Sequence, residues 1–213
     1  MILTGMVIKS APAGEYDRRL VILTCERGKI TAFARGARRP GSTLMASSAP
    51  FVFGTFALYE GRDAYSLVSA DVQNYFREIT EDMEAACYGF YFLEFADYYG
   101  RENLEALEML KLLYQSLRAL LKNAIPNRLV RAVFELKLME INGEYMEKPL
   151  GKLEDSTIYT WEYVLASPVE KLYTFTVSEK VLEEFIKCVA ENKRRFVDKT
   201  FHSLDILDVL VYK

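Results

Sequence analysis

The sequence predicts an α+β protein in which an N-terminal five-stranded OB-type β-barrel is followed by an all-α helical domain. Two observations lead to this prediction. The first 75 or so residues hold short runs of β-branched and aromatic residues separated by turn residues. From Thr80 onward, apolar residues recur at helical spacing instead. The change of pattern predicts two domains, residues 1–79 and residues 80–213.

Five predicted strands make up the first domain. Their sequences are MVIKSA (6–11), RRLVILTC (18–25), KITAFARG (29–36), FVFGTFALYE (51–60) and AYSLVSADV (64–72). Five strands this short bury little apolar surface as an open sheet. Closing them into a barrel removes the exposed edges and creates a core, so we expect a small OB-type barrel.

Four helical segments follow, and a fifth is expected at the C-terminal end. They cover residues 80–100, 102–123, 125–143 and 178–195, with a final short helix from Ser203. The third begins after Pro126 and ends at Asn142–Gly143, as Pro favours helix starts and Gly favours helix ends. Between Glu144 and Ser167 the periodicity weakens, and no element is predicted there.

The composition is that of a folded cytoplasmic protein. Of the 213 residues, 51% are hydrophobic and 27% are charged. Charged residues interrupt every apolar stretch well before the ~18 residues that a membrane span needs. The N-terminus lacks the features of a signal peptide. Three cysteines far apart in the sequence indicate reduced thiols rather than a disulfide framework.

The charge is distributed unevenly along the chain. The formal net charge is -3, yet the first 50 residues hold eight basic residues and three acidic ones. Three arginines crowd into KITAFARGARRPGS (29–42), which has few apolar side chains. Local positive charge on an otherwise acidic chain suggests either a solvated turn or a site for a negatively charged partner.

A search for enzymatic chemistry finds little. The single histidine, His202, excludes a histidine-rich metal site, and there is no phosphate-binding P-loop, nucleophile elbow or dinucleotide fingerprint. Glu15 and Asp17 are the residues that a metal-dependent nuclease would use, although a hairpin turn explains two such acids without a ligand. We therefore predict a protein that is not an enzyme and needs no metal or cofactor.

The basic residues mark strand ends and turns. They start the second strand (Arg18, Arg19), lie at the next turn (Arg27, Lys29) and follow the third strand (Arg35, Arg38, Arg39). Strand ends meet at the rims of a barrel, so these charges are candidates for one groove that follows a phosphate backbone without reading sequence. Aromatic side chains nearby would add stacking surfaces: Tyr16, Phe33, Tyr59 and Tyr65. The alternative is that the charges only solvate turns and the aromatic rings fill the core.

Several strings resemble the bacterial RecO family of recombination mediators. They are the Gly14–Asp17 turn, the T-x-x-x-G-K step at Thr24–Lys29 and ARGARRPGS at Ala34–Ser42. YGFYFLEFAD and LVRAVFELKLMEINGEYMEKP resemble its helical domain, and FHSLDIL its C-terminal part. The likeness runs through nearly the whole chain in the family's order.

The resemblance implies a cytoplasmic, nucleoid-associated DNA repair protein. Members of the family bind single- and double-stranded DNA, anneal complementary strands and associate with RecR. They also bind the C-terminal tail of single-stranded-DNA-binding protein and help to load RecA. The rival interpretation is a protein-interaction adaptor whose barrel docks a protein partner without touching DNA. If the family's role applies, the phosphate-contacting set here is Lys9, Arg18, Arg19, Arg27, Lys29, Arg35, Arg38 and Arg39.

Two further expectations concern the helical domain. An acidic, partly apolar tail needs a basic and apolar groove, for which Arg128 and Arg131 are candidates, although both also suit a solvent-facing helix. Many family members carry four zinc-binding cysteines in this domain, whereas residues 144–167 here contain none. Zinc binding is therefore not expected, and packing must hold this region instead.

Overall fold

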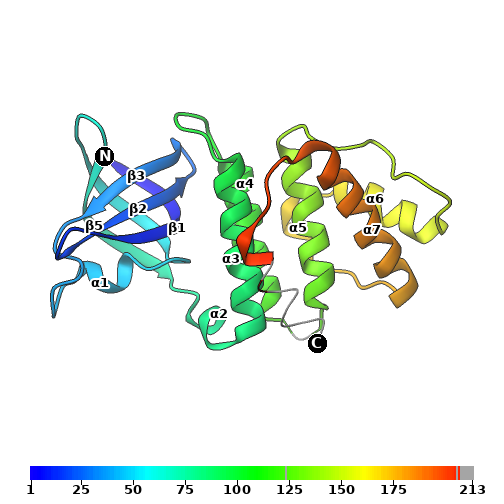
Figure 1. Cartoon of the computed structure of the whole chain (residues 1–213), viewed down its shortest axis with the longest axis horizontal. Helices are drawn as coiled ribbons and strands as arrows, with labels where there is room; N and C mark the ends of the chain where they lie inside the picture. Colours follow the sequence, from blue (N-terminus) through cyan, green and yellow to red (C-terminus); the bar gives the residue numbers. More distant parts are fainter. Residues whose placement is uncertain (123, 205, 207–213) are drawn as a thin grey trace. The chain divides into compact units, whose positions relative to one another are not determined.

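The computed structural model describes residues 1–122, 124–204 and 206 (Figure 1). The chain divides into two units, each with its own core. The first unit consists of residues 1–77 together with 93–110, and the second of 78–92 together with the residues from 111 onward. The division into 1–79 and 80–213 follows chain order alone and stays a prediction. No helix in the described part of the chain is long and apolar enough to cross a membrane.

The first unit contains a closed five-stranded barrel of the OB type, as predicted. Its strands are β1 (Ile2–Ala13), β2 (Asp17–Thr24), β3 (Gly28–Ala34), β4 (Phe53–Glu60) and β5 (Tyr65–Asn74). They pair in the order β1-β2-β3-β5-β4, and β1 closes the ring by pairing with β4. Only the short β3–β5 contact is parallel. A helix of four residues, α1 (Leu44–Ser47), lies between β3 and β4 and was not predicted.

Alternating side chains fill the barrel. In β3, buried and half-buried residues alternate without a break, which is the period of two expected for one buried face. Val7, Ile22, Ile30 and Phe56 meet in the interior and are almost wholly buried. The barrel core is therefore apolar, and the charged residues of these strands lie outside it.

Part of the outer face is buried as well. Met6 and Leu23 lie opposite each other on β1 and β2, and both are fully buried although their neighbours Val7 and Ile22 already face the interior. The same unit includes residues 93–110, which contact the outer face through Asp97, bound to Lys9 of β1 and Lys29 of β3. A covered face explains why β2 ends in consecutive buried residues rather than in an alternating pattern.

Residues 101–106 attach to the β2–β3 turn through their main chain. Lys29 N–H donates to the carbonyl of Arg101 (3.0 Å), Asn103 N–H to Arg27 (2.9 Å) and Ala106 N–H to Cys25 (3.0 Å). The fit is close at Gly28, where a Cβ atom would lie 2.2 Å from the Arg101 carbonyl oxygen and 2.3 Å from that of Leu104. This attachment explains the glycine of the T-x-x-x-G-K step.

The helices largely follow the predicted pattern. They are α2 (Arg77–Glu81), α3 (Met83–Tyr99), α4 (Leu107–Leu120), α5 (Asn127–Ile141), α6 (Asp155–Ala166) and α7 (Glu179–Phe196). α4 begins five residues later than predicted, because residues 102–106 bind to the β2–β3 turn instead. α6 was missed. The final helix predicted from Ser203 lies mostly outside the described residues.

In the second unit, buried side chains hold residues 144–167, the segment that contains no cysteines. α5, α6 and α7 pack together, and the fully buried Trp161 of α6 meets Phe185 of α7 edge to face, with ring centroids 6.3 Å apart. The Trp161 indole N–H donates to the carbonyl of Met146 (3.2 Å). The buried Asn192 accepts from Met146 N–H (2.8 Å) and donates to the Glu144 carbonyl (3.3 Å). Residues 144–146 are thereby fixed to α6 and α7.

We predict that Gly28→Ala destabilises the first unit far more than Gly14→Ala does. Both glycines have positive φ, +60° and +62°, so an alanine at either position is strained in the left-handed region by a similar amount, about 1 kcal/mol. Only the new Cβ at residue 28 also clashes with main chain, which adds on the order of 1–3 kcal/mol. Urea unfolding of the two variants measures the difference. Equal losses would contradict the close attachment of residues 101–106.

Candidate nucleic-acid interface

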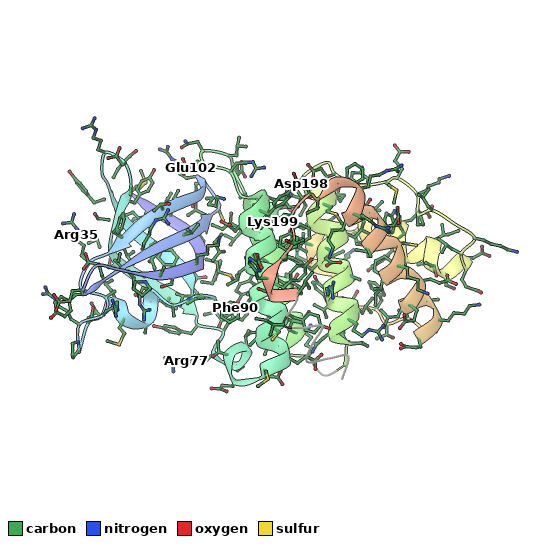
Figure 2. The ribbon with its side chains drawn as sticks, viewed as in Figure 1. Arg35, Arg77, Phe90, Glu102, Asp198 and Lys199 are labelled. Atoms are coloured by element: carbon green, nitrogen blue, oxygen red, sulfur yellow. The ribbon has the colours of Figure 1, made fainter. Side chains whose placement is uncertain are left out.

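Five of the eight predicted DNA-binding residues lie at one end of the barrel, here called the arginine end: Arg18, Arg19, Arg35, Arg38 and Arg39. The register places them together, because Ala13 pairs with Asp17 beside the β1–β2 turn and Arg18 pairs with Ala34 at the exit of β3. In Figure 2, Arg35 projects from this end of the barrel and Glu102 lies at the opposite end.

The loop after β3 folds back onto the β1–β2 turn. Arg38 N–H donates to the carbonyl of Tyr16 (2.8 Å), and the Arg38 guanidinium donates to the carbonyl of Gly14 (3.2 Å). The Arg39 guanidinium carbon lies 5.0 Å from the centre of the Tyr16 ring. Gly36 N–H donates to the carboxylate of Asp17 (2.7 Å). These contacts hold the loop in one conformation, so its arginines are presented from a fixed backbone.

The arginines at this end differ in how far they are engaged. Arg18 donates to the Met45 and Ser48 carbonyls (3.4 Å each) and to the Ser48 hydroxyl (3.2 Å), so it serves to hold α1. In contrast, the exposed side chains of Arg19 and Arg35 make no hydrogen bond or ion pair with any described residue. No acidic side chain in the described part of the chain forms an ion pair with any of the five, so their charges stay available to an anion.

Two aromatic side chains, Phe33 and Tyr59, lie in the same cross-strand row as Arg19 on the outer face of the barrel. Arg19 pairs with Phe33, Phe33 with Ser66, and Ser66 with Tyr59, across strands β2, β3, β5 and β4. Residues directly opposite each other on neighbouring strands point to the same face. The Tyr59 side chain is 69% exposed, and Phe33 is half-buried. Tyr65, in contrast, packs against the barrel core. Of these rings, Tyr59 offers an exposed surface for base stacking and Phe33 a half-buried one, whereas Tyr65 packs inward.

The other three predicted residues, Lys9, Arg27 and Lys29, do not join the arginine end. Arg27 lies in the β2–β3 turn, at the opposite end of the barrel, and donates to the Asn103 side chain (3.5 Å). Lys9 and Lys29 both bind Asp97 of α3, at 2.7 Å and 3.2 Å from its carboxylate oxygens. The eight residues thus form two groups rather than the single groove expected from the sequence.

Asp97 was not identified from the sequence. Burial disfavours its charged form, but the hydrogen bond from Lys9 and the charges of Lys29 and Lys9 outweigh that effect and lower its pKa. The carboxylate is therefore ionised at neutral pH. An acid within the apolar segment FLEFADYY was the only sequence signal, since a half-buried carboxylate needs a cation.

The two acids considered for a nuclease, Glu15 and Asp17, belong to no cluster of three or more potential metal ligands in the part of the chain that the structure describes. Asp17 accepts the hydrogen bond from Gly36, and Glu15 is exposed in the β1–β2 turn beside Tyr16. A hydrogen bond with Glu15 raises the pKa of the Tyr16 hydroxyl. No group of three or more potential metal ligands occurs among the described residues. Cys25, Cys87 and Cys188 form no disulfide bond.

The candidate tail-binding residues of α5 are both engaged by glutamates. Arg128 forms ion pairs with Glu179 (3.1 Å) and with Glu183 of α7. Arg131 pairs with the buried Glu135 (3.1 Å). An acidic peptide that bound these arginines would have to replace glutamates already in place.

Glu135 is the centre of this charged cluster. Its carboxylate accepts from the Tyr91 hydroxyl (2.5 Å) and from the Lys193 ammonium (2.8 Å) as well as from Arg131. Burial opposes ionisation, but the charges of Lys193 and Arg131 and these hydrogen bonds prevail and lower the pKa of Glu135. A buried carboxylate with this many partners stabilises the fold only while it is charged.

We predict that Glu135→Gln lowers the free energy of unfolding by on the order of 3 kcal/mol at neutral pH, because it leaves Lys193 and Arg131 uncompensated. The folded-state pKa of Glu135 is depressed, so its contribution is complete above the ordinary pKa of 4.5 and disappears as pH falls through the lower folded value. The variant should therefore lose less stability on acidification than the native chain. Urea unfolding at neutral and acidic pH tests this, with Glu162→Gln as control, because Glu162 is an exposed acid of α6 that makes no hydrogen bond or ion pair with any described residue. Parallel pH profiles for Glu135→Gln and the native chain would contradict the prediction.

Comparisons with known proteins agree with the strings noted in the sequence. Residues 1–76 match the family model for the N-terminal domain of recombination protein O, and residues 80–147 match the model for its C-terminal domain. A "DNA repair protein RecO" from Acetivibrio thermocellus is 29% identical over 97% of this chain and 96% of its own length. One from Alkaliphilus metalliredigens is 35% identical over 65% of this chain and 56% of its own length. One from Clostridium acetobutylicum is 23% identical over 97% of this chain and 96% of its own length. Because the two family models together match more than half of the chain in consecutive order, this chain belongs to the RecO family of DNA repair proteins.

Proposed function

We propose that this chain binds DNA at the arginine end of its barrel and acts in recombination without any covalent chemistry. The observation that carries the proposal is a set of arginines, fixed by the folded loop at residues 36–39, that have no acidic partner among the described residues. Unpaired guanidinium groups on a fixed backbone suit phosphate oxygens, which they bind through two parallel hydrogen bonds.

The geometry favours binding that does not depend on base sequence. Arg19, Phe33 and Tyr59 lie in one row on the outer face of the barrel. A single DNA strand along this row could place its phosphates on the arginines and its bases on the aromatic rings. Stacking on an aromatic ring tolerates every base. We propose that single-stranded DNA uses both features and that double-stranded DNA uses the arginines alone.

Binding of this kind also suits the activities that the resemblance implies, strand annealing and the loading of RecA. Neutralising phosphates on two strands reduces their repulsion, which supports annealing of complementary strands. We propose that the chain anneals strands and, together with RecR, helps to load RecA onto DNA coated with single-stranded-DNA-binding protein. The tail of that protein would bind near Arg128 and Arg131, in competition with Glu179 and Glu183. These roles place the chain at the nucleoid in the cytoplasm.

Two other functions make different predictions. A protein-interaction adaptor would show no salt-dependent affinity for DNA, because its arginines would be incidental. A nuclease that used Glu15 and Asp17 would cleave DNA when Mg²⁺ is added. The hydrogen bond between Asp17 and Gly36 gives this carboxylate a structural role, which disfavours the nuclease.

The decisive measurement is the affinity for a fluorescent single-stranded oligonucleotide at several salt concentrations. We predict that changing Arg35, Arg38 and Arg39 to Ala weakens binding and reduces the slope of log K against log salt by up to about 2, at about 0.7 for each lost phosphate contact. Binding that is unchanged in this variant would overturn the arginine end as the interface.

A matched control removes the same charge elsewhere on the surface. Arg62, Arg118 and Lys152 are exposed and make no hydrogen bond or ion pair with any described residue, so their joint replacement by Ala should leave the salt slope unchanged. A loss of slope equal to that of the arginine variant would mean that overall charge, and not the arginine end, drives binding.

A further inference from the structure

Asp97 binds two lysines through its two carboxylate oxygens. Oδ2 lies 2.7 Å from the Lys9 ammonium, and Oδ1 lies 3.2 Å from that of Lys29. Lys29 also donates to the main-chain carbonyl of Asp97 (2.8 Å). One acid with two oxygens, each facing an ammonium group, has the charge and the shape that a DNA phosphate would present to the same lysines.

Without Asp97, the basic surface of the arginine end would extend further along the barrel. Lys9 pairs with Val21, and Ala11 pairs with Arg19, so Lys9 lies one diagonal step from Arg19 on the outer face of β1 and β2. Diagonal neighbours on adjacent strands lie roughly 7–8 Å apart. A strand that contacts Arg19 therefore passes within reach of the Lys9 ammonium.

We propose that Asp97 is an internal competitor for phosphate, which withholds Lys9 and Lys29 from DNA and ends the interface at Arg19. This inference rests on the DNA binding proposed above, and it identifies Asp97 as a residue that determines the extent of that site.

The competition favours Asp97 for three physical reasons. The carboxylate is tethered to the same unit, so it loses no translational freedom on binding the lysines, whereas a phosphate does. Its side chain is only 14% exposed, which protects the contacts from solvent and salt. Attachment of residues 101–106 to the β2–β3 turn keeps the end of α3 beside Lys29, so the main chain that carries Asp97 cannot move away without breaking these hydrogen bonds.

Asp97→Asn tests the proposal by removing the charge while keeping the size of the side chain. We expect tighter binding of a single-stranded oligonucleotide and a salt slope that is steeper by about 0.7 to 1.4, for one or two additional phosphate contacts. Asp71→Asn is the matched control, because this exposed acid of β5 carries the same charge and has no recorded partner among the described residues. An equal gain in DNA affinity in both variants would show that only the overall charge matters and would overturn the proposal. A folded Asp97→Asn variant with no gain in affinity would overturn it as well.

Lys9→Ala in the otherwise native chain gives a second test that does not depend on the folding of Asp97→Asn. Lys9 is half exposed, and its ammonium is withheld in the native chain, so the substitution should leave the salt slope unchanged. In the Asp97→Asn background it should remove about 0.7 of the added slope. A loss of about 0.7 in the native background would show that Lys9 already contacts DNA and would overturn the proposal.

The two proposals fail in different patterns. If the Arg35, Arg38 and Arg39 variant loses affinity while Asp97→Asn matches the native chain, DNA binding stands and the role of Asp97 is overturned. If native binding does not respond to the arginine substitutions, the interface itself is overturned, and the inference about Asp97 fails with it.

Discussion

The close approach of main chain to Gly28 is the constraint on which the rest of the first unit depends. Carbonyl groups of Arg101 and Leu104 occupy the space where any other residue would place its Cβ atom. The approach lets residues 101–106 bond to the β2–β3 turn, and it draws residues 93–110 into the barrel unit. One end of the outer face is thereby covered, and the other stays open.

This covering also decides which positive charges are available. At the covered end Lys29 is held by Asp97, and Arg27 is near Asn103, whereas Arg19 and Arg35 at the open end have no partner among the described residues. All eight basic residues carry a formal positive charge, but the arginines without an acidic partner are concentrated at the arginine end of the barrel. A site for a phosphate backbone needs free charge, because an ammonium already paired with a carboxylate gains little by exchanging it for a phosphate.

The same principle applies to the second unit. Arg128 and Arg131 are as basic as Arg35, but each is paired with glutamates of its own unit. Around Glu135 the charges serve stability, since a buried carboxylate is tolerated only when cations and hydroxyl groups surround it. Trp161 and Asn192 both bind the main chain of Met146, so packing and hydrogen bonds hold this cysteine-free segment.

Local patterns determined the barrel, most helices and the family, because strand and helix periods, turn glycines and the RecO-like strings are properties of neighbouring residues. α6 was missed because its Ile, Thr, Tyr and Trp residues have modest helix propensity, and tertiary burial of Trp161 and Val164 compensates for it. The late start of α4 and the division of the basic residues depended on residues 101–106 meeting Gly28, some 75 positions earlier in the chain. Only the tertiary structure could place Asp97 beside Lys9 and Lys29, since pairing between such distant residues leaves no period in the sequence.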